Sequence, residues 1–189
     1  MTSSTQGGRA FWKSYWNGLY ATPRAWAHKG ENLIHAFEAV ASATDPNSMH
    51  LNMHDQALML AGMAIEVQLK AILVNLPEVR AVVTVSKPLG ASAAGVLWNA
   101  FYSHNISDLA RASNIKLSIK QRRVANALSQ YIYWRGRYVV PTERGIDDLL
   151  PTKLESGLMG QKHRITTEDA RELIAYVVSE VKGRLYAQT

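Results

Sequence analysis

The fold of this chain is decided by residues 52–75, NMHDQALMLAGMAIEVQLKAILVN. The segment is apolar on nearly every side, and after its first turn the only charged residues in it are Glu66 and Lys70. A surface helix carries one apolar stripe, whereas a helix that is apolar all round is buried. The stretch therefore predicts a helix at the centre of a helical bundle.

Glu66 and Lys70 are four residues apart in the acid-before-base order that favours an ion pair on one helix face. A buried carboxylate also needs a cationic or hydrogen-bonding partner. Arg135 falls on the apolar side of a later predicted helix, so we expect it to reach Glu66. The predicted structural ion pair is Glu66, Lys70 and Arg135. Phosphate binding at a helix end is the alternative for Arg135.

Four further helices are predicted from apolar stripes at helical spacing and from residues suited to cap helix starts. Their starts are Thr22 with Pro23, Asn105 with Asp108, Ser118 with Gln121, and Thr166 with Asp169. Residues 77–103 contain a β-branched run over 79–85, which is either a short strand or extended, and a stretch over 87–95 with proline and glycines, so an irregular insertion is predicted there. A long connection is predicted over 142–165. The expected fold is an all-α helical bundle of about five main helices, with an irregular insertion between the second and third.

The composition of the 189 residues, 47% hydrophobic and 19% charged, is that of a globular protein. We expect one domain over 22–189, preceded by an aromatic arm over 1–21 that packs on the domain or on a partner chain. The absence of cysteine excludes disulfides, thiol catalysis and cysteine-bound zinc. The polar N-terminus and the lack of 18 consecutive apolar residues predict a cytoplasmic protein with no membrane partner.

Basic residues are concentrated in one part of the chain. Between positions 111 and 144 there are eight Lys or Arg and one acid, an excess of +7 in a chain whose net charge is +6. This asymmetry indicates an anionic partner. The predicted nucleic-acid-binding residues are Arg122, Arg123, Gln130, Tyr133 and Arg137. Arg122, Arg123 and Gln130 share the outer face of one predicted helix with Asn126. Tyr133 is available for stacking on a base. A solvated basic face without a ligand is the alternative.

Three segments resemble a known family when taken in order. They are AGMAIEVQLKA over 61–71, HNISDL over 104–109, and WRGRY over 134–138 followed by Pro141. Together they resemble the HEPN superfamily of helical-bundle proteins, over about residues 22–141. Bacterial members show a Glu–three residues–Lys helix, then a His–Asn or Asp segment, then an Arg-Tyr-Pro ending. Here Val139 and Val140 intervene before the proline.

The resemblance implies an HEPN-like bundle that forms a homodimer and has an RNA-directed role in a toxin–antitoxin or phage-defence system, with an antitoxin protein as partner. Catalytic members resemble metal-independent ribonucleases with an arginine followed, after four to six residues, by a histidine. Histidine would move protons and arginine would stabilise developing charge. Here the nearest histidine after Arg137 is His163. We therefore expect a noncatalytic or divergent member that binds RNA, a nucleotide or a partner protein.

Two alternatives remain open from the sequence. One is a ribonuclease toxin with a rearranged site, in which Arg137 or Arg135 acts with His104 or His163 as catalytic residues. The other is a structural oligomerisation domain that depends on the aromatic arm.

A metal site is not predicted, because His50 and His54, one turn apart, lack an identifiable third ligand beyond the adjacent Asp55. No cofactor is predicted either, because the chain has no glycine-rich phosphate loop.

Overall fold

The computed structural model describes residues 18, 21–43, 53–80, 93–135, 152–153, 159–160 and 165–186. Within these ranges the protein is an all-α bundle of seven helices. They are α2 (Pro23–Ala43), α3 (His54–Asn75), α5 (Ala93–Tyr102), α6 (Ile106–Ala112), α7 (Ile119–Gln130), the π-helix η1 (Tyr131–Arg135) and α9 (Thr167–Tyr186). Two-residue strands, β1 (Thr152–Lys153) and β2 (Met159–Gly160), form one antiparallel pair.

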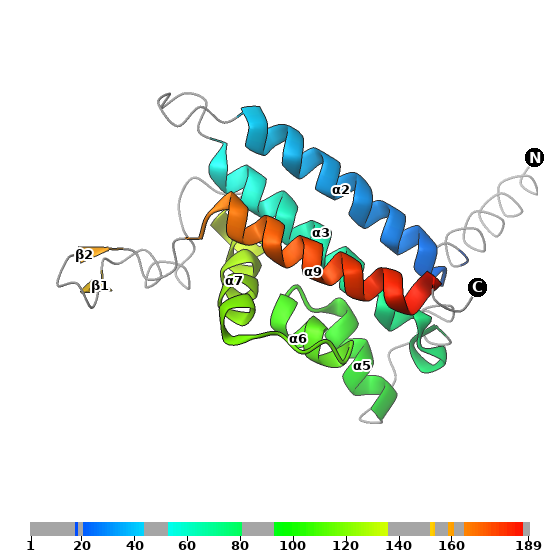
Figure 1. The fold of residues 1–189 in the computed structure, drawn as a ribbon. Helices are drawn as coiled ribbons and strands as arrows, with labels where there is room; N and C mark the ends of the chain where they lie inside the picture. Colours follow the sequence, from blue (N-terminus) through cyan, green and yellow to red (C-terminus); the bar gives the residue numbers. More distant parts are fainter. Residues whose placement is uncertain are drawn as a thin grey trace, which may run out of the picture.

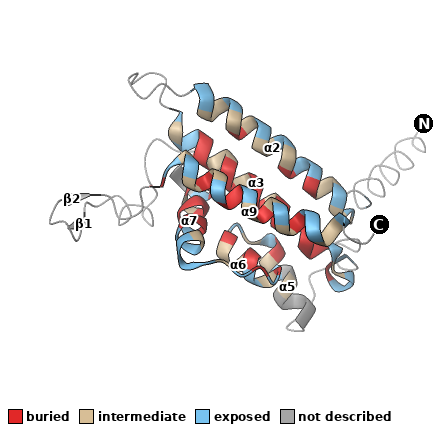
Figure 2. Ribbon diagram, viewed as in Figure 1, coloured by how far each residue is buried: buried red, intermediate tan, exposed pale blue. Residues whose placement is uncertain are grey.

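The helix α3 is the centre of the bundle, as its sequence predicts. It packs against α2, α5, α6, α7, η1 and α9. In Figure 1, α2, α3 and α9 lie side by side, with α2 antiparallel to the other two, and α5, α6 and α7 lie below them. Figure 2 shows buried residues along α3 and on the inward faces of its neighbours. The core is therefore built around this one helix.

A glycine lets η1 approach α3 closely. A Cβ atom added at Gly62 would lie 2.9 Å from Ile132 Cγ1 and 3.1 Å from the Leu128 carbonyl oxygen. Both distances are shorter than ordinary van der Waals contact. Because Gly62 has no Cβ atom, the α7–η1 segment can lie this close to the central helix.

By length and composition alone, α3 is also the one helix among the described residues that is apolar enough to cross a membrane. However, 78% of its most apolar window is buried inside the protein. That burial is what a bundle requires of its central helix, so the apolar character is accounted for by packing.

The cap signals predict the helix starts correctly. Asn105 Oδ1 accepts from the Asp108 amide at 3.2 Å and begins α6. Ser118 and Gln121 form a reciprocal capping box at the start of α7. The Thr166 amide donates to Asp169 Oδ2 at 2.9 Å before α9. Local side-chain hydrogen bonds of this kind depend on few residues and can be read directly from a sequence.

Two predictions about the helices are wrong. The insertion between the second and third predicted helices is not wholly irregular, because it contains α5. Leu97 and Phe101 are one turn apart, and Phe101 is buried with its ring centroid 5.2 Å from that of Trp26. Tertiary packing thus stabilises a helix beside a glycine-rich stretch. The fourth predicted helix also divides, because its last turn winds as the π-helix η1. The described residues therefore form seven helices, where about five main ones were predicted.

Candidate functional site

Glu66 and Lys70 form an ion pair inside the bundle. Lys70 Nζ donates to Glu66 Oε1 at 2.6 Å, and the two side chains are 8% and 9% exposed. The Lys70 ammonium also lies 5.5 Å from the ring centroid of Phe101 on α5. The pair therefore sits where α5 covers α3. Because each charge compensates the other, neither is left alone in the interior.

His104 approaches the same carboxylate from the connection between α5 and α6. Its Nδ1 lies 3.0 Å from Glu66 Oε2 and 3.1 Å from Oε1. An ionised carboxylate only accepts hydrogen bonds, so Nδ1 carries the proton and donates. In the neutral ring Nε2 is then unprotonated. The His104 side chain is 48% exposed. The arrangement is a half-exposed imidazole held by a buried ion pair.

Two neighbours fix the position of this imidazole. Asn105, the next residue, caps α6 with its side chain, and its amide donates to Ser103 Oγ at 2.9 Å. The ring of Tyr133 in η1 stands edge-on to the His104 ring, with centroids 5.7 Å apart and an angle of 87°. His104 thus joins three elements, and we name Glu66, Lys70, His104 and Tyr133 the charged cluster.

The structure brings some of the predicted residues together and leaves others outside its description. Glu66 and Lys70 pair as predicted, and His104 also contacts the carboxylate. The predicted contact of Arg135 with Glu66 lies outside the described residues. Arg135 ends η1, and its side chain lies outside the described residues, as do Arg137 and His163. Sequence reasoning missed the His104–Glu66 contact. The available signal was the position of the histidine immediately before the cap of α6.

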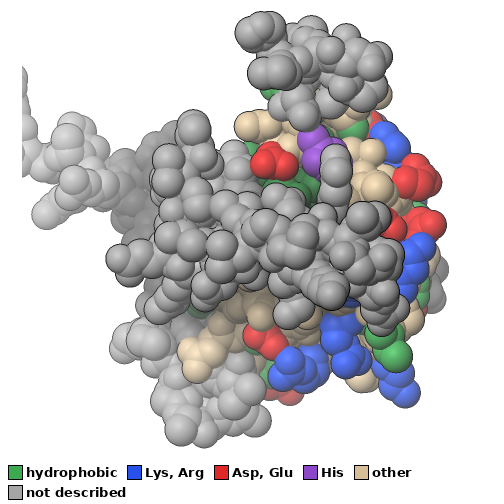
Figure 3. Space-filling model, turned by 90° about the vertical axis from the view of Figure 1, so that its left-hand side faces the viewer, with side chains coloured by type: hydrophobic (Ala, Val, Ile, Leu, Met, Phe, Trp, Pro, Cys, Tyr) green, Lys and Arg blue, Asp and Glu red, His purple; other side chains and the backbone are tan. Residues whose placement is uncertain are grey.

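A second surface lies along the outer side of α7. Arg122, Arg123 and Asn126 are exposed as predicted, whereas Gln130 is only partly exposed. In the described part of the chain no carboxylate lies within 4.0 Å of Arg122 or Arg123. Figure 3, seen from the side on which α7 lies in Figure 1, shows Lys and Arg side chains gathered along the lower edge.

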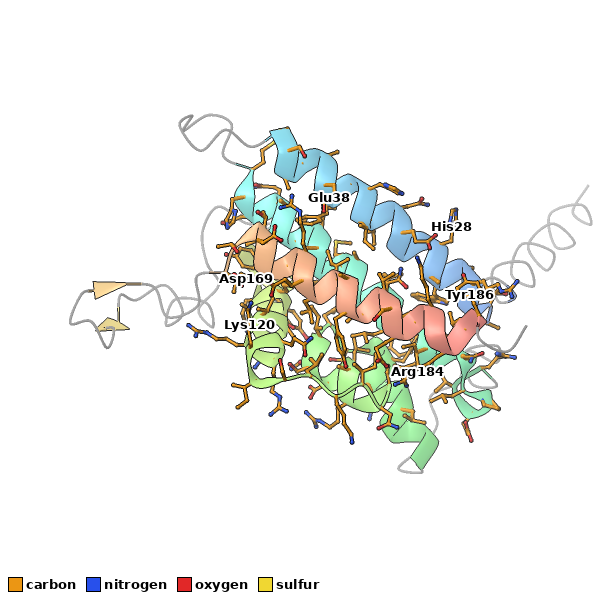
Figure 4. All side chains as sticks on the ribbon, in the orientation of Figure 1. His28, Glu38, Lys120, Asp169, Arg184 and Tyr186 are labelled. Carbon is orange, nitrogen blue, oxygen red and sulfur yellow. The ribbon has the colours of Figure 1, made fainter. Side chains whose placement is uncertain are left out.

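Lys120, the other α7 cation near this surface, is neutralised by α9. Its Nζ lies 2.6 Å from Glu172 Oε2 and 3.9 Å from Asp169 Oδ1 (Figure 4). The hydrogen bond to Glu172 raises the pKa of Lys120 above its ordinary value. The pKa of Asp169 is lowered, mainly by the Thr166 hydrogen bonds and less by the charges of Lys120 and Arg123. Arg122 and Arg123 remain available to an outside anion.

The basic surface extends beyond α7 to residues that the sequence did not single out. A hollow of about 580 Å³ between α6 and α7 is lined by Arg111, Lys116 and Arg122. A smaller one of about 260 Å³ is lined by Arg122 and Arg123 together with Asn126 and Ile119. Arg111 and Lys116 belong to the basic stretch of the sequence, but only the fold places them beside Arg122. We name Arg111, Lys116, Arg122 and Arg123 the basic surface.

The remaining predicted residues lie apart from the basic surface. Tyr133 is exposed but stands against His104, so it belongs to the charged cluster. His54, the first residue of α3, has its Nε2 atom 3.3 Å from the carbonyl oxygen of Ile165. His50 is outside the described residues. Among the side chains that the structure places, no group of three or more His, Cys, Asp or Glu is arranged to hold a metal ion.

Comparison of the chain with protein-family models, with curated proteins and with solved structures gives no match. Its function is therefore inferred from the charged cluster and the basic surface.

Proposed function

We propose that this chain is a noncatalytic, divergent HEPN-like bundle that binds RNA through its basic surface. The observation that carries the proposal is the pair Arg122 and Arg123, which are exposed and have no carboxylate within 4.0 Å among the described residues. Arginine presents a planar fork of donors that matches a phosphate group. Each phosphate that the surface contacts also releases condensed counterions, which favours binding.

Neighbouring residues support a nucleic acid rather than a small inorganic anion. Ile119, at the start of α7, is 88% exposed beside the two arginines. An apolar side chain among cations offers a contact to the face of a base while the cations bind the backbone. Asn126 adds a hydrogen-bonding group on the same hollow. The surface thus offers cations, an apolar side chain and a hydrogen-bonding amide around one hollow.

The family part of the proposal is supported by how the resembling segments meet. Glu66 and Lys70 come from the first segment, and His104, 38 residues after Glu66, comes from the second. The third begins at residue 134, next to Tyr133, whose ring contacts His104. Two of the three segments therefore meet at one carboxylate, and the third directly follows a residue that contacts His104. Within this proposal the protein is a homodimer, which its mass in solution would test.

A paired charge reversal tests the RNA-binding proposal. We expect Arg122→Glu with Arg123→Glu to weaken binding of a labelled RNA, measured by fluorescence anisotropy, by about tenfold or more. The matched control is Lys29→Glu with Lys182→Glu, which changes the net charge equally on exposed positions of α2 and α9. Circular dichroism verifies that both variants fold. Equal weakening in the two variants, or no binding by the unaltered protein, would overturn the proposal.

A second candidate function, ribonuclease activity, is favoured by the His104–Glu66 contact. With Nδ1 donating to Glu66, Nε2 is free to take the proton of a ribose 2′-hydroxyl. The 2′-oxygen would attack the adjacent phosphorus to form a 2′,3′-cyclic phosphate, and the 5′-oxygen would leave with the proton returned by His104 Nε2. Arg135 or Arg137 would stabilise the charge on the phosphate.

Incubation of the purified protein with total RNA separates the two functions. Cleavage that persists with a chelator and is lost in both His104→Gln and Arg137→Ala would support the ribonuclease. Intact RNA together with salt-sensitive binding would support the binding module.

A further inference from the structure

Three hollows on this side of the molecule are joined through two arginines. The first lies at the start of α7, the second between α6 and α7, and the third, of about 500 Å³, between α5 and α6. Arg122 lines both the first and the second. Arg111 lines both the second and the third. Each pair of neighbouring hollows therefore has one arginine in common.

This arrangement matches the chemistry of a short single strand. Three consecutive nucleotides are joined by two phosphates, and the three hollows are divided by two arginines. Each terminal hollow also has an apolar wall for a base, formed by Ile119 in the first and by Leu97 and Ala100 in the third. A duplex keeps its bases stacked and paired, whereas a single strand can place them in separate hollows.

We infer that the three hollows hold consecutive nucleotides of single-stranded RNA, with Arg122 and Arg111 each at one of the two phosphates between them. This inference rests on the proposed function and specifies the form of RNA and its path, from α7 across α6 to α5. It assigns Arg111, one residue of the basic surface, to a particular phosphate.

The wall of the central hollow is held in place before RNA arrives. The α6–α7 connection turns at Asn114, whose φ is +53°. Arg184 on α9 donates to the carbonyl oxygens of Ser113 and Asn114, at 2.6 and 2.9 Å. Tyr176 Oη donates to the Lys116 carbonyl oxygen at 3.0 Å. The backbone that carries Lys116 is therefore preorganised, which reduces the entropy lost on binding.

Asp108 competes with RNA for Arg111. The Asp108 carboxylate lies 2.5 Å from Arg111 Nη2 and also lines the third hollow. Both side chains are well exposed, and exposed ion pairs of this kind are weak. A phosphate can therefore displace Asp108, but the carboxylate still repels it. Removing the negative charge of Asp108 should therefore strengthen RNA binding. A purely structural role for the Asp108–Arg111 pair would not have this effect.

The test measures binding of a labelled oligouridylate of about 12 nucleotides by anisotropy at several salt concentrations. We expect Arg111→Gln to weaken binding and to reduce the slope of log affinity against log salt by about 0.7, the value for one phosphate contact on a single strand. Asp108→Asn should strengthen binding. Lys29→Gln, on α2, is the matched control for loss of one exposed cation. A duplex RNA of equal length should bind more weakly than the single strand.

The outcomes distinguish this inference from the proposed function. If Arg122→Glu with Arg123→Glu abolishes binding while Arg111→Gln and Asp108→Asn leave affinity within about twofold, the path across α6 is wrong and the RNA-binding function stands. Tighter binding of the duplex would also overturn the path. If the unaltered protein binds neither RNA, both proposals fail.

Discussion

His104 Nδ1 donates to the Glu66 carboxylate at 3.0 Å and so ties the α5–α6 connection to the central helix α3. The same carboxylate accepts from Lys70 at 2.6 Å. The buried Glu66 therefore accepts from the buried Lys70 on its own helix and from the half-exposed His104 on another segment. Removal of Lys70 and removal of His104 should consequently lower the free energy of unfolding by different amounts.

Lys70→Met should be strongly destabilising. It leaves the Glu66 carboxylate without its buried cation, and breaking a buried pair on one side costs about 3–5 kcal/mol. Replacing both residues, with Glu66→Leu and Lys70→Met, removes the uncompensated charge and should recover most of that loss. Urea unfolding of the two variants measures the difference. A double variant no more stable than Lys70→Met would contradict a paired role.

Gly62→Ala should destabilise the protein by about 1–3 kcal/mol, because the new methyl group would press on Ile132 and the Leu128 carbonyl. Gly183→Ala is the matched control, since its Cβ would meet no atom within 4 Å on the exposed side of α9. That change should stabilise the helix by up to about 1 kcal/mol. The unfolding free energy should therefore fall in Gly62→Ala and rise in Gly183→Ala. A change of the same sign in both variants would contradict the close approach of η1 to α3.

The fold could be predicted largely because its signals are local. The apolar run of α3 and the caps at Asn105, Ser118 and Thr166 each depend on residues close in sequence, and all were read correctly. The helix α5 could not be found this way, because it depends on the contact of Phe101 with Trp26, far away in the chain. The π-helix has no sequence rule of comparable strength.

Asp169 should make stability depend on pH at the acid end. The Thr166 backbone hydrogen bond is the largest cause that lowers its pKa below the ordinary value of 3.8. A lowered pKa in the folded state means that the stabilisation is present above pH 3.8 and is lost as the pH falls through the folded value. The melting temperature should therefore be higher for the unaltered protein than for Asp169→Asn at neutral pH, and the gap should close in acid. A difference in melting temperature that does not change with pH would show that the charge of Asp169 is not involved.

Arg184→Leu should loosen the α6–α7 connection. The guanidinium group donates to the carbonyl oxygens of Ser113 and Asn114, and hydrogen bonds made by charged groups contribute about 1.5–3 kcal/mol each. We expect faster amide hydrogen exchange over residues 113–117, measured by mass spectrometry, with α2 unchanged. Uniform faster exchange throughout the protein would instead indicate general unfolding.

The candidate site was less predictable than the fold. Charge counting located the basic stretch, and helical spacing placed Arg122 and Arg123 on the outer face. Neither method could show that α9 neutralises Lys120, or that Arg111 and Lys116 line one hollow with Arg122. These relations depend on packing between helices. His104 was recognised as a candidate, but its partner Glu66, on another helix, becomes apparent only in three dimensions.

The salt dependence of RNA binding reports phosphate contacts made by the basic surface. If the basic surface binds phosphates, log affinity should fall linearly with log salt, and Arg122→Ala with Arg123→Ala should reduce the slope by about 1.4, the value for two contacts on a single strand. Lys29→Ala with Lys182→Ala should leave the slope unchanged. Affinity that does not respond to salt, or equal slopes for the two double variants, would contradict the account.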